Sequence, residues 1–438
     1  MTIKHIITAF TLAAMLCSTH VAAAQSQSLS VTQCREMALA HSETIKRGQN
    51  AISRAELDRQ IAGNAMLPQL DGSLMGLVAK DNDVMGYTLQ MRGVYLAGLT
   101  LTQPIYVGGK IVTGKKLAQI GKDCAELNAQ RDRAQVIADV DNAYYSLLAV
   151  RSKLDVLAAY RTQLEALHST VETSVKAQMA TENDLLRIDA KLSEILYQQQ
   201  KATNGEQLCR MVLCNAIGLD LGTPVTLADT VLPSTLPSLL DRDISQRPEV
   251  QLLNKQIEAR ELQVKMERAE MLPTVALQLG YSYYGNIKMK GSVLAEDGNY
   301  YPFSKEYHGD VPMAMLSVQI PLWHWGTERK KMKQAQLDVE DARLDLEENS
   351  RLMRIEAEQA ARNVQDSFTM IETAKRGLEQ AQENLRVMRL KHEHAMATLT
   401  DVLDAHAQWQ QAQSNLIEAR TQHLINLTEY QRVTGRLL

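Results

Sequence analysis

Two features are absent from the sequence, and each absence rules out a class of protein. Beyond its first residues, no stretch reaches the roughly 20 apolar residues that a helix needs to cross a bilayer, so any membrane insertion must use strands. No cluster of basic residues occurs either, and the formal net charge is −4. A chain with this balance is a poor partner for phosphate backbones. We therefore expect no nucleic-acid partner.

Catalytic and metal-binding signatures are also missing. Of the five cysteines, Cys209 and Cys214 lie about 140° apart around a helix, which places them poorly for a disulfide or a shared metal ion, so we expect buried thiols. His392 and His394 point about 200° apart on a helix and cannot hold one ion. No Ser-His-Asp arrangement, glycine-rich phosphate loop or Cys/His cluster occurs. The sequence predicts no enzymatic activity, no cofactor and no metal site.

The first residues have the pattern of an export signal. Lys4 supplies the positive charge, Ile6–Leu16 form the apolar segment, and Ala22–Ala24 form a small-residue cleavage site. The bulky residue before Cys17 disfavours a lipoprotein signal, where a small residue is usual. We predict a signal peptide at residues 1–24 and expect the mature protein to leave the cytoplasm.

Proline and glycine are scarce over two long segments. Residues 122–217 and 327–434 contain no proline, and each contains a single glycine, Gly205 and Gly377 respectively. Both segments are rich in Ala, Leu, Gln, Glu, Arg and Lys, which favour helices. A helix of about 60 residues is on the order of 90 Å long, which exceeds the needs of a globular core.

Apolar residues in the last segment repeat every three or four positions. The repeat runs through Val402, Ala405, Trp409, Ala412, Leu416, Ala419, His423, Asn426, Tyr430, Val433 and Leu437. This is coiled-coil spacing, with His423 and Asn426 as the polar exceptions. The frequent alanines predict close packing against more than one neighbouring helix.

The chain is an internal duplication. MATENDLL begins at Met179 and MATLTDVL at Met396, and the same shift of 217 residues relates Pro104 to Pro321. Such self-similarity indicates two copies of one structural unit. Further upstream, the two Leu-Pro pairs that end at Pro68 and Pro273 are related by a shift of 205 residues. The second copy therefore carries 12 extra residues, which we place between Lys288 and Asp310.

The duplication predicts the organisation of the whole chain. The units are the signal peptide at 1–24, a first repeat at 25–221, an inter-repeat linker at 222–248 and a second repeat at 249–438. Helices are expected at 31–66, about 110–178, 182–218, 249–271, about 326–395 and 399–436. Strands are expected at about 69–82, 91–104, 274–285 and 311–321, where apolar and small polar residues alternate.

The predicted strands hold most of the aromatic residues. Tyr281, Tyr283 and Trp323 are examples, whereas the long helices hold few aromatics. This distribution is typical of the aromatic belts of membrane barrels and is also compatible with a soluble sandwich. Two strands per repeat give four, and a membrane barrel needs at least about eight to remove its edges. A barrel would therefore require several copies of the chain.

Taken together, these residues resemble the TolC-type outer-membrane efflux channels. TQPIYVGGK at Thr102–Lys110 and QIPLWHWGT at Gln319–Thr327 resemble the strand-to-helix junctions of that family, with Pro104, Gly108, Gly109, Pro321 and Gly326 as their shaping residues. TLTDVLDAHAQWQQAQSNLIEARTQHLINLTEYQRVTG is similar to the last helix of the family.

The resemblance implies a fold and a function. The fold would be mainly α with membrane β: a homotrimer with a 12-stranded barrel in the outer membrane lipid, four strands per protomer, and a periplasmic α-barrel of helical hairpins. The function would be the passive exit duct of a tripartite efflux or type I secretion system, with a periplasmic adaptor and an inner-membrane pump as partners. The alternative from the residues alone is a periplasmic coiled-coil adaptor or scaffold, which predicts one hairpin and a compact β-domain.

The resemblance also implies functional residues at the two hairpin tips. Asp401 and Asp404 match aspartates that form a narrow electronegative entrance, while in the first copy Asp184 is matched and Arg187 replaces the second carboxylate. We expect Arg187 to pair with one of the two aspartates across the tips. The predicted tip residues, where an adaptor would dock, are Met179, Ala180, Thr181, Met396, Ala397 and Thr398. Thr181 and Thr398 each precede an aspartate by three residues, which predicts helix capping.

The sequence departs from the family pattern in three places. Family members often have glycine at the hairpin turn, whereas Gln178 and Ala395 precede the two tips here. Because the printed chain stops at Leu438, the resemblance would leave only residues 222–248 to build an equatorial belt. We also expect a longer external loop in the second copy, at 286–310, than in the first, near 80–87.

Overall fold

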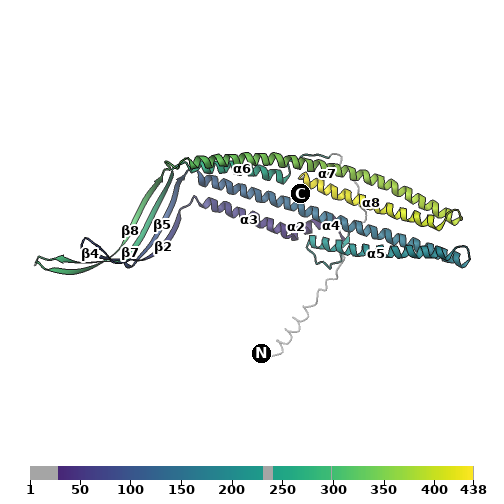
Figure 1. Ribbon diagram of the computed structural model, residues 1–438, viewed down its shortest axis with the longest axis horizontal. Helices are drawn as coiled ribbons and strands as arrows, with labels where there is room; N and C mark the ends of the chain where they lie inside the picture. Colours follow the sequence, from purple (N-terminus) through teal and green to yellow (C-terminus); the bar gives the residue numbers. More distant parts are fainter. Residues whose placement is uncertain (1–27, 230–239, 297, 438) are drawn as a thin grey trace, which may run out of the picture. The chain divides into compact units, whose positions relative to one another are not determined.

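The computed structural model describes residues 28–229, 240–296 and 298–437 (Figure 1). The predicted signal peptide and Cys17 lie outside these residues, as does the middle of the predicted linker. Within the described ranges, no helix combines the length and apolar character needed to cross a membrane. The chain divides into two compact units, which are described separately below.

The first unit comprises residues up to Lys46, Asp132–Ile244 and Arg354 onward, and the second comprises Arg47–Arg131 and Ser245–Met353. The helices are α2 (Val31–His41), α3 (Glu43–Asn64), α4 (Lys110–Lys176), α5 (Glu182–Ile217), α6 (Pro248–Ala269), α7 (Thr327–Glu393) and α8 (Leu399–Val433). The strands are β1 (Ser28–Leu29), β2 (Gln69–Val78), β3 (Asn82–Val84), β4 (Tyr87–Gln90), β5 (Arg92–Val107), β6 (Thr226–Leu227), β7 (Thr274–Leu294) and β8 (Tyr300–Gln319).

Helices occupy the segments that lack proline, but the first predicted helix is interrupted. The range predicted as helical at 31–66 forms two helices, because α2 and α3 are separated at Ser42, whose ψ is 127°. The carbonyl of Ser42 accepts a hydrogen bond from the N–H of Lys46, as the residue that begins a helix does. Serine favours such positions over helix interiors, because its hydroxyl competes for backbone groups.

The second unit contains an antiparallel sheet whose long strands lie in the order β2, β5, β7, β8 (Figure 1). The central pair joins the two sequence repeats, since β5 pairs with β7 from Tyr95↔Gly285 to Val107↔Thr274. The outer strands β2 and β8 each pair with one long strand among the described residues. Large apolar side chains are exposed along both edges.

The hairpin of β7 and β8 is longer than expected. Its ladder extends to the pair Leu294↔Tyr300, so most of the loop predicted at 286–310 is strand. The register shifts at Asn286, which has a φ of 63° and donates hydrogen bonds from its side-chain amide to the carbonyls of Arg92 and Gly93 at 3.0 Å each. This bulge lets the strands continue past the end of the β5 ladder, so the insertion lengthens the hairpin. In the first copy, the region expected as a loop forms the short pair β3 and β4.

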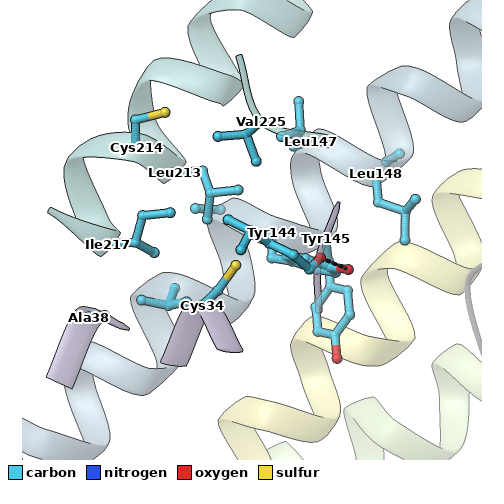
Figure 2. Close-up of a cluster of buried hydrophobic side chains, with 14 of the residues drawn as sticks. Cys34, Ala38, Tyr144, Tyr145, Leu147, Leu148, Leu213, Cys214, Ile217 and Val225 are labelled. Carbon is cyan, nitrogen blue, oxygen red and sulfur yellow. Dashed lines mark hydrogen bonds between the residues drawn. The ribbon is translucent and has the colours of Figure 1, made fainter. Parts of the chain in front are cut away.

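The core of the first unit is built where α2, α4 and α5 meet. Figure 2 shows Cys34 from α2, Tyr144 from α4 and Leu213 from α5 packed together. Cys34 and Cys214 are buried free thiols, whereas Cys124 and Cys209 are only partly buried. At the margin of this core, Asp141 is fully buried and accepts hydrogen bonds from Arg35 and from the hydroxyl of Thr428. The buried carboxylate is therefore paired, as its desolvation requires.

The three-four repeat predicted in the last segment forms the buried face of α8. Val402, Leu416 and Val433 are buried, which confirms the pattern. The polar exceptions have partners on α7: His423 Nδ1 lies 3.0 Å from Ser367 Oγ, and the side-chain amide of Asn426 donates to the carbonyl of Asn363 at 3.1 Å. Polar residues are thus accommodated because the neighbouring helix satisfies them.

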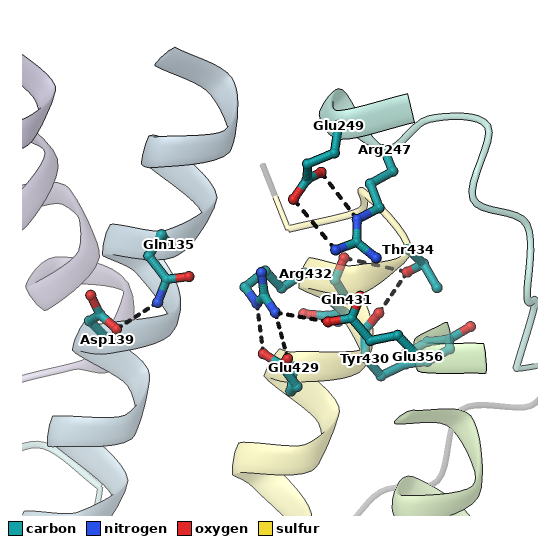
Figure 3. A network of polar contacts seen from close by, with 10 residues as sticks. All are labelled: Gln135, Asp139, Arg247, Glu249, Glu356, Glu429, Tyr430, Gln431, Arg432 and Thr434. Atoms are coloured by element: carbon teal, nitrogen blue, oxygen red, sulfur yellow. Dashed lines mark hydrogen bonds and ion pairs between the residues drawn. The ribbon is translucent and has the colours of Figure 1, made fainter. Parts of the chain in front are cut away.

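Ion pairs and hydrogen bonds hold the end of α8. Figure 3 shows Arg432 between Glu429, at 2.7 Å, and Glu356 of α7, at 3.6 Å. The hydroxyl of Tyr430 donates to the carbonyl of Asp241 at 2.7 Å, and Arg436 pairs with the Asp241 carboxylate. The described end of the predicted linker is therefore anchored to α8.

Candidate functional site

The two helical hairpins of the first unit end in turns of the same design, which lie at one end of the helices (Figure 1). After α4, the N–H of Met179 donates to the carbonyl of Ser174 at 2.8 Å, and that of Gln178 donates to the carbonyl of Val175 at 2.9 Å. This is the Schellman pattern of helix termination, in which the residue after the helix is left-handed. Gln178 occupies that position with a φ of 59°.

The turn after α7 repeats this pattern. The N–H of Met396 donates to the carbonyl of Lys391 at 2.7 Å, and that of Ala395 donates to the carbonyl of His392 at 2.9 Å. Ala395 has a φ of 57°. Both turns therefore form without glycine, by placing a residue with a side chain in a conformation that glycine adopts at lower cost.

Each following helix begins with a capping box, as predicted. In the first copy, the N–H of Asp184 donates to Thr181 Oγ1 at 3.3 Å, and Asp184 Oδ2 accepts from the hydroxyl and the N–H of Thr181 at 2.7 and 3.1 Å. In the second copy, Thr398 and Asp401 make the same three bonds. Bonds from the threonine hydroxyl and then from its N–H lower the pKa of both aspartates, so these carboxylates stay ionised at neutral pH.

Asp404 differs from the two capping aspartates. It is exposed one helical turn beyond Asp401, on the same side of α8. In the part of the chain that the structure describes, its carboxylate has no hydrogen bond or ion pair. Three acidic residues were predicted for the entrance, Asp184, Asp401 and Asp404, and Asp404 is the one that does not cap a helix.

Arg187 connects the two tips, but through a different residue than expected. Its Nη1 donates to the hydroxyl of Thr400 on α8, at 2.5 Å. Among the described residues of one protomer, Arg187 forms no ion pair with Asp401 or Asp404. Thr400 was missed from the sequence, because it lies 213 residues from Arg187 and no local pattern relates them.

Apolar packing supports the tips from within. The exposed residues Met179 and Met396, 83% and 70% exposed, lie beyond a buried cluster. That cluster combines Leu157, Tyr160, Leu164 and Val171 of α4 with Ile188 and Ile195 of α5 and Leu399 and Leu403 of α8. The start of α8 is therefore held against the first hairpin.

A buried polar group lies within this support. His406 of α8 is 1% exposed and stacks on Tyr160, with 5.4 Å between ring centroids. Arg389 of α7 donates to His406 Nε2 at 3.0 Å and to Gln163 Oε1 at 2.8 Å. Burial and then the Arg389 charge lower the pKa of His406 to about 4, so the ring is neutral at physiological pH. Sequence reasoning missed this group, although a polar residue beside the apolar repeat of α8 was a signal for it.

The strand-to-helix junctions lie in the second unit. Gly108 and Gly109 adopt φ values of 64° and 84°, and a Cβ on Gly108 would lie 2.6 Å from the carbonyl oxygen of Ala269. In the second copy Trp325 and Gly326 have φ values of 57° and 73°. Pro104 lies at a register shift of β5, and Pro321 lies two residues after the end of β8. The left-handed pair turns the chain from strand to helix in both copies.

A family model described as "Outer membrane efflux protein" matches residues 34–210 and 239–436. The chain belongs to the outer membrane efflux protein family. It is 24% identical over 358 residues to the outer membrane protein TolC of Escherichia coli K12, covering 78% of this chain and 69% of that protein. The predicted TolC-type resemblance is thereby confirmed.

Solved structures show the same fold. The CusC channel aligns with a TM-score of 0.77 at 15% identity, covering 92% of each chain. The outer membrane protein VceC of Vibrio cholerae aligns with a TM-score of 0.74 at 16% identity, covering 92% of this chain and 96% of that one. The predicted fold class is confirmed, and so is the function of an outer-membrane efflux channel, the exit duct of a tripartite system. The adaptor alternative has no support.

Proposed function

We propose that three copies of this chain assemble into one duct, whose barrel of twelve strands takes β2, β5, β7 and β8 from each copy. The observation that carries this proposal is the open sheet of the second unit. Its outer strands β2 and β8 leave long edges that no other described segment of the chain pairs with, and their apolar side chains are exposed. Unpaired backbone groups are costly in lipid, and closure is the only arrangement that removes both edges.

The hairpin tips would form the periplasmic entrance of this duct. Three copies bring together six carboxylates from Asp401 and Asp404, which favours cations at a constriction. Within one protomer, the described residues contain no group of three metal-ligating side chains. Binding of a divalent cation therefore requires the carboxylates of more than one copy.

Arg187 would act as a contact that holds the two tips of a protomer together. Its hydrogen bond to Thr400 joins α5 to the first turn of α8, next to Asp401. Opening the entrance by separating the hairpins would break this bond. The cluster that packs α8 against the first hairpin is apolar, and apolar packing tolerates small displacements better than a directional hydrogen bond does.

The exposed turns themselves would dock a periplasmic adaptor, which links the duct to an inner-membrane pump. The docking surface consists of Met179, Ala180, Thr181, Met396, Ala397 and Thr398. Exposed methionines are adaptable apolar contacts and are common in protein-binding surfaces. The pump supplies the energy for export, and the duct conducts passively.

The assembly is tested by fractionation followed by native mass spectrometry of the detergent-extracted protein. We expect the protein in the outer-membrane fraction, requiring detergent, with a mass of three chains. A soluble periplasmic monomer would contradict the proposal. Adaptor docking is tested separately by adding Met179→Glu with Met396→Glu, which should abolish adaptor capture and leave the trimer intact.

A further inference from the structure

The start of α7 carries an exposed aromatic and cationic surface that the duct function does not explain. Leu322, Trp323 and Trp325 are 88%, 73% and 81% exposed, and the two indoles contact edge to face with 5.8 Å between centroids. Trp325 is held in a left-handed conformation, which is costly for a residue with a side chain. The turn thus presents two large apolar rings to the surroundings.

Four cations follow in the first turns of α7, and they form a short basic cluster where the sequence was expected to have none. Arg329, Lys330, Lys331 and Lys333 are exposed, and none of them has an ion pair among the described residues. The one acidic residue beside them, Glu328, is engaged by His324, whose Nδ1 lies 2.8 Å from Glu328 Oε1. The surface, defined here as residues 322–333, is therefore strongly positive next to its apolar part.

The apolar part continues the exposed face of β8. Leu316, Val318 and Ile320 alternate with small polar residues along the strand and are exposed by more than half. In a strand, residues two apart point to the same side. The exposed apolar face therefore runs from β8 into the tryptophan pair and ends at the cations.

The first copy of the junction shows that the turn does not require the two indoles or the cations at 329–331. The shift of 217 residues relates Trp325 to Gly108, Arg329 to Val112 and Lys331 to Gly114. The same left-handed turn forms there with Tyr106 in the place of Trp323, without an indole, and with lysines at 110, 115 and 116. Of the two copies, only the second has the tryptophan pair and the Arg-Lys-Lys run at 329–331.

We propose that residues 322–333 bind acidic phospholipid in the periplasmic leaflet of the outer membrane. The inference rests on the proposed placement of the sheet in that membrane. Indoles favour the boundary between acyl chains and headgroups, and lysine and arginine side chains reach the headgroup phosphates. Acidic headgroups complement the four unpaired cations, which a neutral lipid surface would not.

Tryptophan fluorescence tests the proposal, because the chain has three tryptophans. Trp409→Phe leaves the two indoles of this surface as the only ones. The full-length variant is reconstituted in phosphatidylcholine vesicles with a minor fraction of phosphatidylglycerol, and one lipid or the other is brominated to quench nearby indoles. We expect the quenching by brominated phosphatidylglycerol to correspond to a local enrichment of this lipid of about fivefold over its mole fraction. One cation near an acidic surface supplies a factor of this size.

Matched variants identify which cations are responsible for the enrichment of phosphatidylglycerol. Lys330→Gln with Lys331→Gln should lower the enrichment, and replacing all four cations by glutamine should abolish it. The control, Lys375→Gln with Arg376→Gln, removes two adjacent exposed cations from the same helix and should retain it. High salt should also abolish the enrichment.

The outcomes separate this inference from the proposed function. If both lipids quench in proportion to their mole fractions, the surface does not prefer acidic lipid. That result overturns this inference and leaves the proposed function as a membrane duct unaffected. An absence of quenching by either lipid means that the surface does not reach the membrane, which overturns the inference together with the placement of the sheet.

Discussion

The two hairpin tips share one backbone and differ in charge. Both have a left-handed residue after the first helix, the sequence Met-Ala-Thr, and a capping aspartate three residues after the threonine. One helical turn later they diverge, since the first tip has Arg187 where the second has Asp404. The residue two further along also differs: exposed Asp189 in the first copy corresponds to buried His406 in the second.

This comparison separates folding from function. Residues that are the same in both copies terminate one helix and begin the next, so they are explained by the turn itself. Residues that differ lie just beyond the caps, where they contribute charge or reach another helix. Arg187 and Asp404 are therefore the positions at which to look for a role in conduction.

The largest effect on stability is expected at His406, which is buried in the second copy at a position where the two copies differ. Its pKa is about 4 in the fold against an ordinary value of 6.5, so the unfolded chain takes up a proton first as pH falls. Stability is full above about pH 6.5 and is lost as pH falls towards 4. Between pH 7.5 and 5 this loss is about 2 kcal/mol per protomer.

Denaturant unfolding at several pH values measures this loss. His406→Gln keeps a hydrogen-bond acceptor for Arg389 and should flatten the profile over that window. His168→Gln is the control, because His168 pairs with the equivalent Asp189 at a partly exposed site. A profile of His406→Gln parallel to that of the unmodified protein would refute the assignment.

The second largest effect is expected from the difference in charge between the two tips, and it concerns the block of the channel by divalent cations. Asp404→Asn should weaken divalent-cation block by about fivefold or more, since charge pairs near a protein surface are worth about 1 kcal/mol or more. Asp401→Asn should weaken it too, but with a destabilised α8, because Asp401 also caps that helix. Planar-bilayer recordings with added Ca²⁺ distinguish them, and unchanged block in both would place the constriction elsewhere.

Substitution of the capping threonine should have the same effect on stability at both tips. Thr181→Ala and Thr398→Ala should each destabilise the first turn of their helix by about 1 kcal/mol, because the helix N-terminus loses its side-chain acceptor. Amide hydrogen exchange in α5 and α8 measures the effect, and the serine variants serve as controls that retain the hydroxyl. A large effect at one tip alone would show that the copies are not equivalent in folding.

A stabilising change is expected at the left-handed positions. Gln178→Gly and Ala395→Gly should each stabilise their turn by about 0.5 to 1 kcal/mol, because glycine adopts positive φ without steric cost. Ala397→Gly is the control, since Ala397 is not left-handed. Thermal unfolding of the single variants checks the sign, and destabilisation by Ala395→Gly would contradict the reading of the turn.

The smallest effect is expected for the contact between the tips. Arg187→Ala and Thr400→Val each remove one exposed hydrogen bond, which is worth about 0.5 kcal/mol, so the open probability of the channel should rise roughly twofold. The double variant should match the single variants, because both remove the same bond. Single-channel recordings showing no change in either variant would end this interpretation.

Much of the fold follows from local pattern and repetition. The absence of proline and glycine located the long helices, and the three-four spacing identified Val402 and Val433 as buried. The capping boxes could be predicted because Thr181 and Asp184 are close in sequence and recur at a fixed shift. These features depend on interactions within a few residues, for which sequence is sufficient.

The remaining features depend on contacts between distant segments. Nothing near Arg187 indicates Thr400 as its partner, and the burial of His406 depends on Tyr160 and Arg389 from two other helices. The long hairpin of β7 and β8 was missed because residues 288–310 show no sustained apolar alternation and include charged residues such as Lys288 and Glu306. Strand pairing stabilised it beyond what its composition suggested.

The central pairing of the sheet has a consequence for assembly. β5 is the later of the two long strands of the first repeat and β7 is the earlier of the two in the second, so their ladder joins a later strand to an earlier one. In a closed ring of chains, β8 and the β2 of the neighbouring copy meet in that same relation. In the proposed trimer, each protomer would contain, between its own halves, a covalently connected version of the boundary it shares with its neighbours. The duct would then be a near-sixfold ring built from three chains.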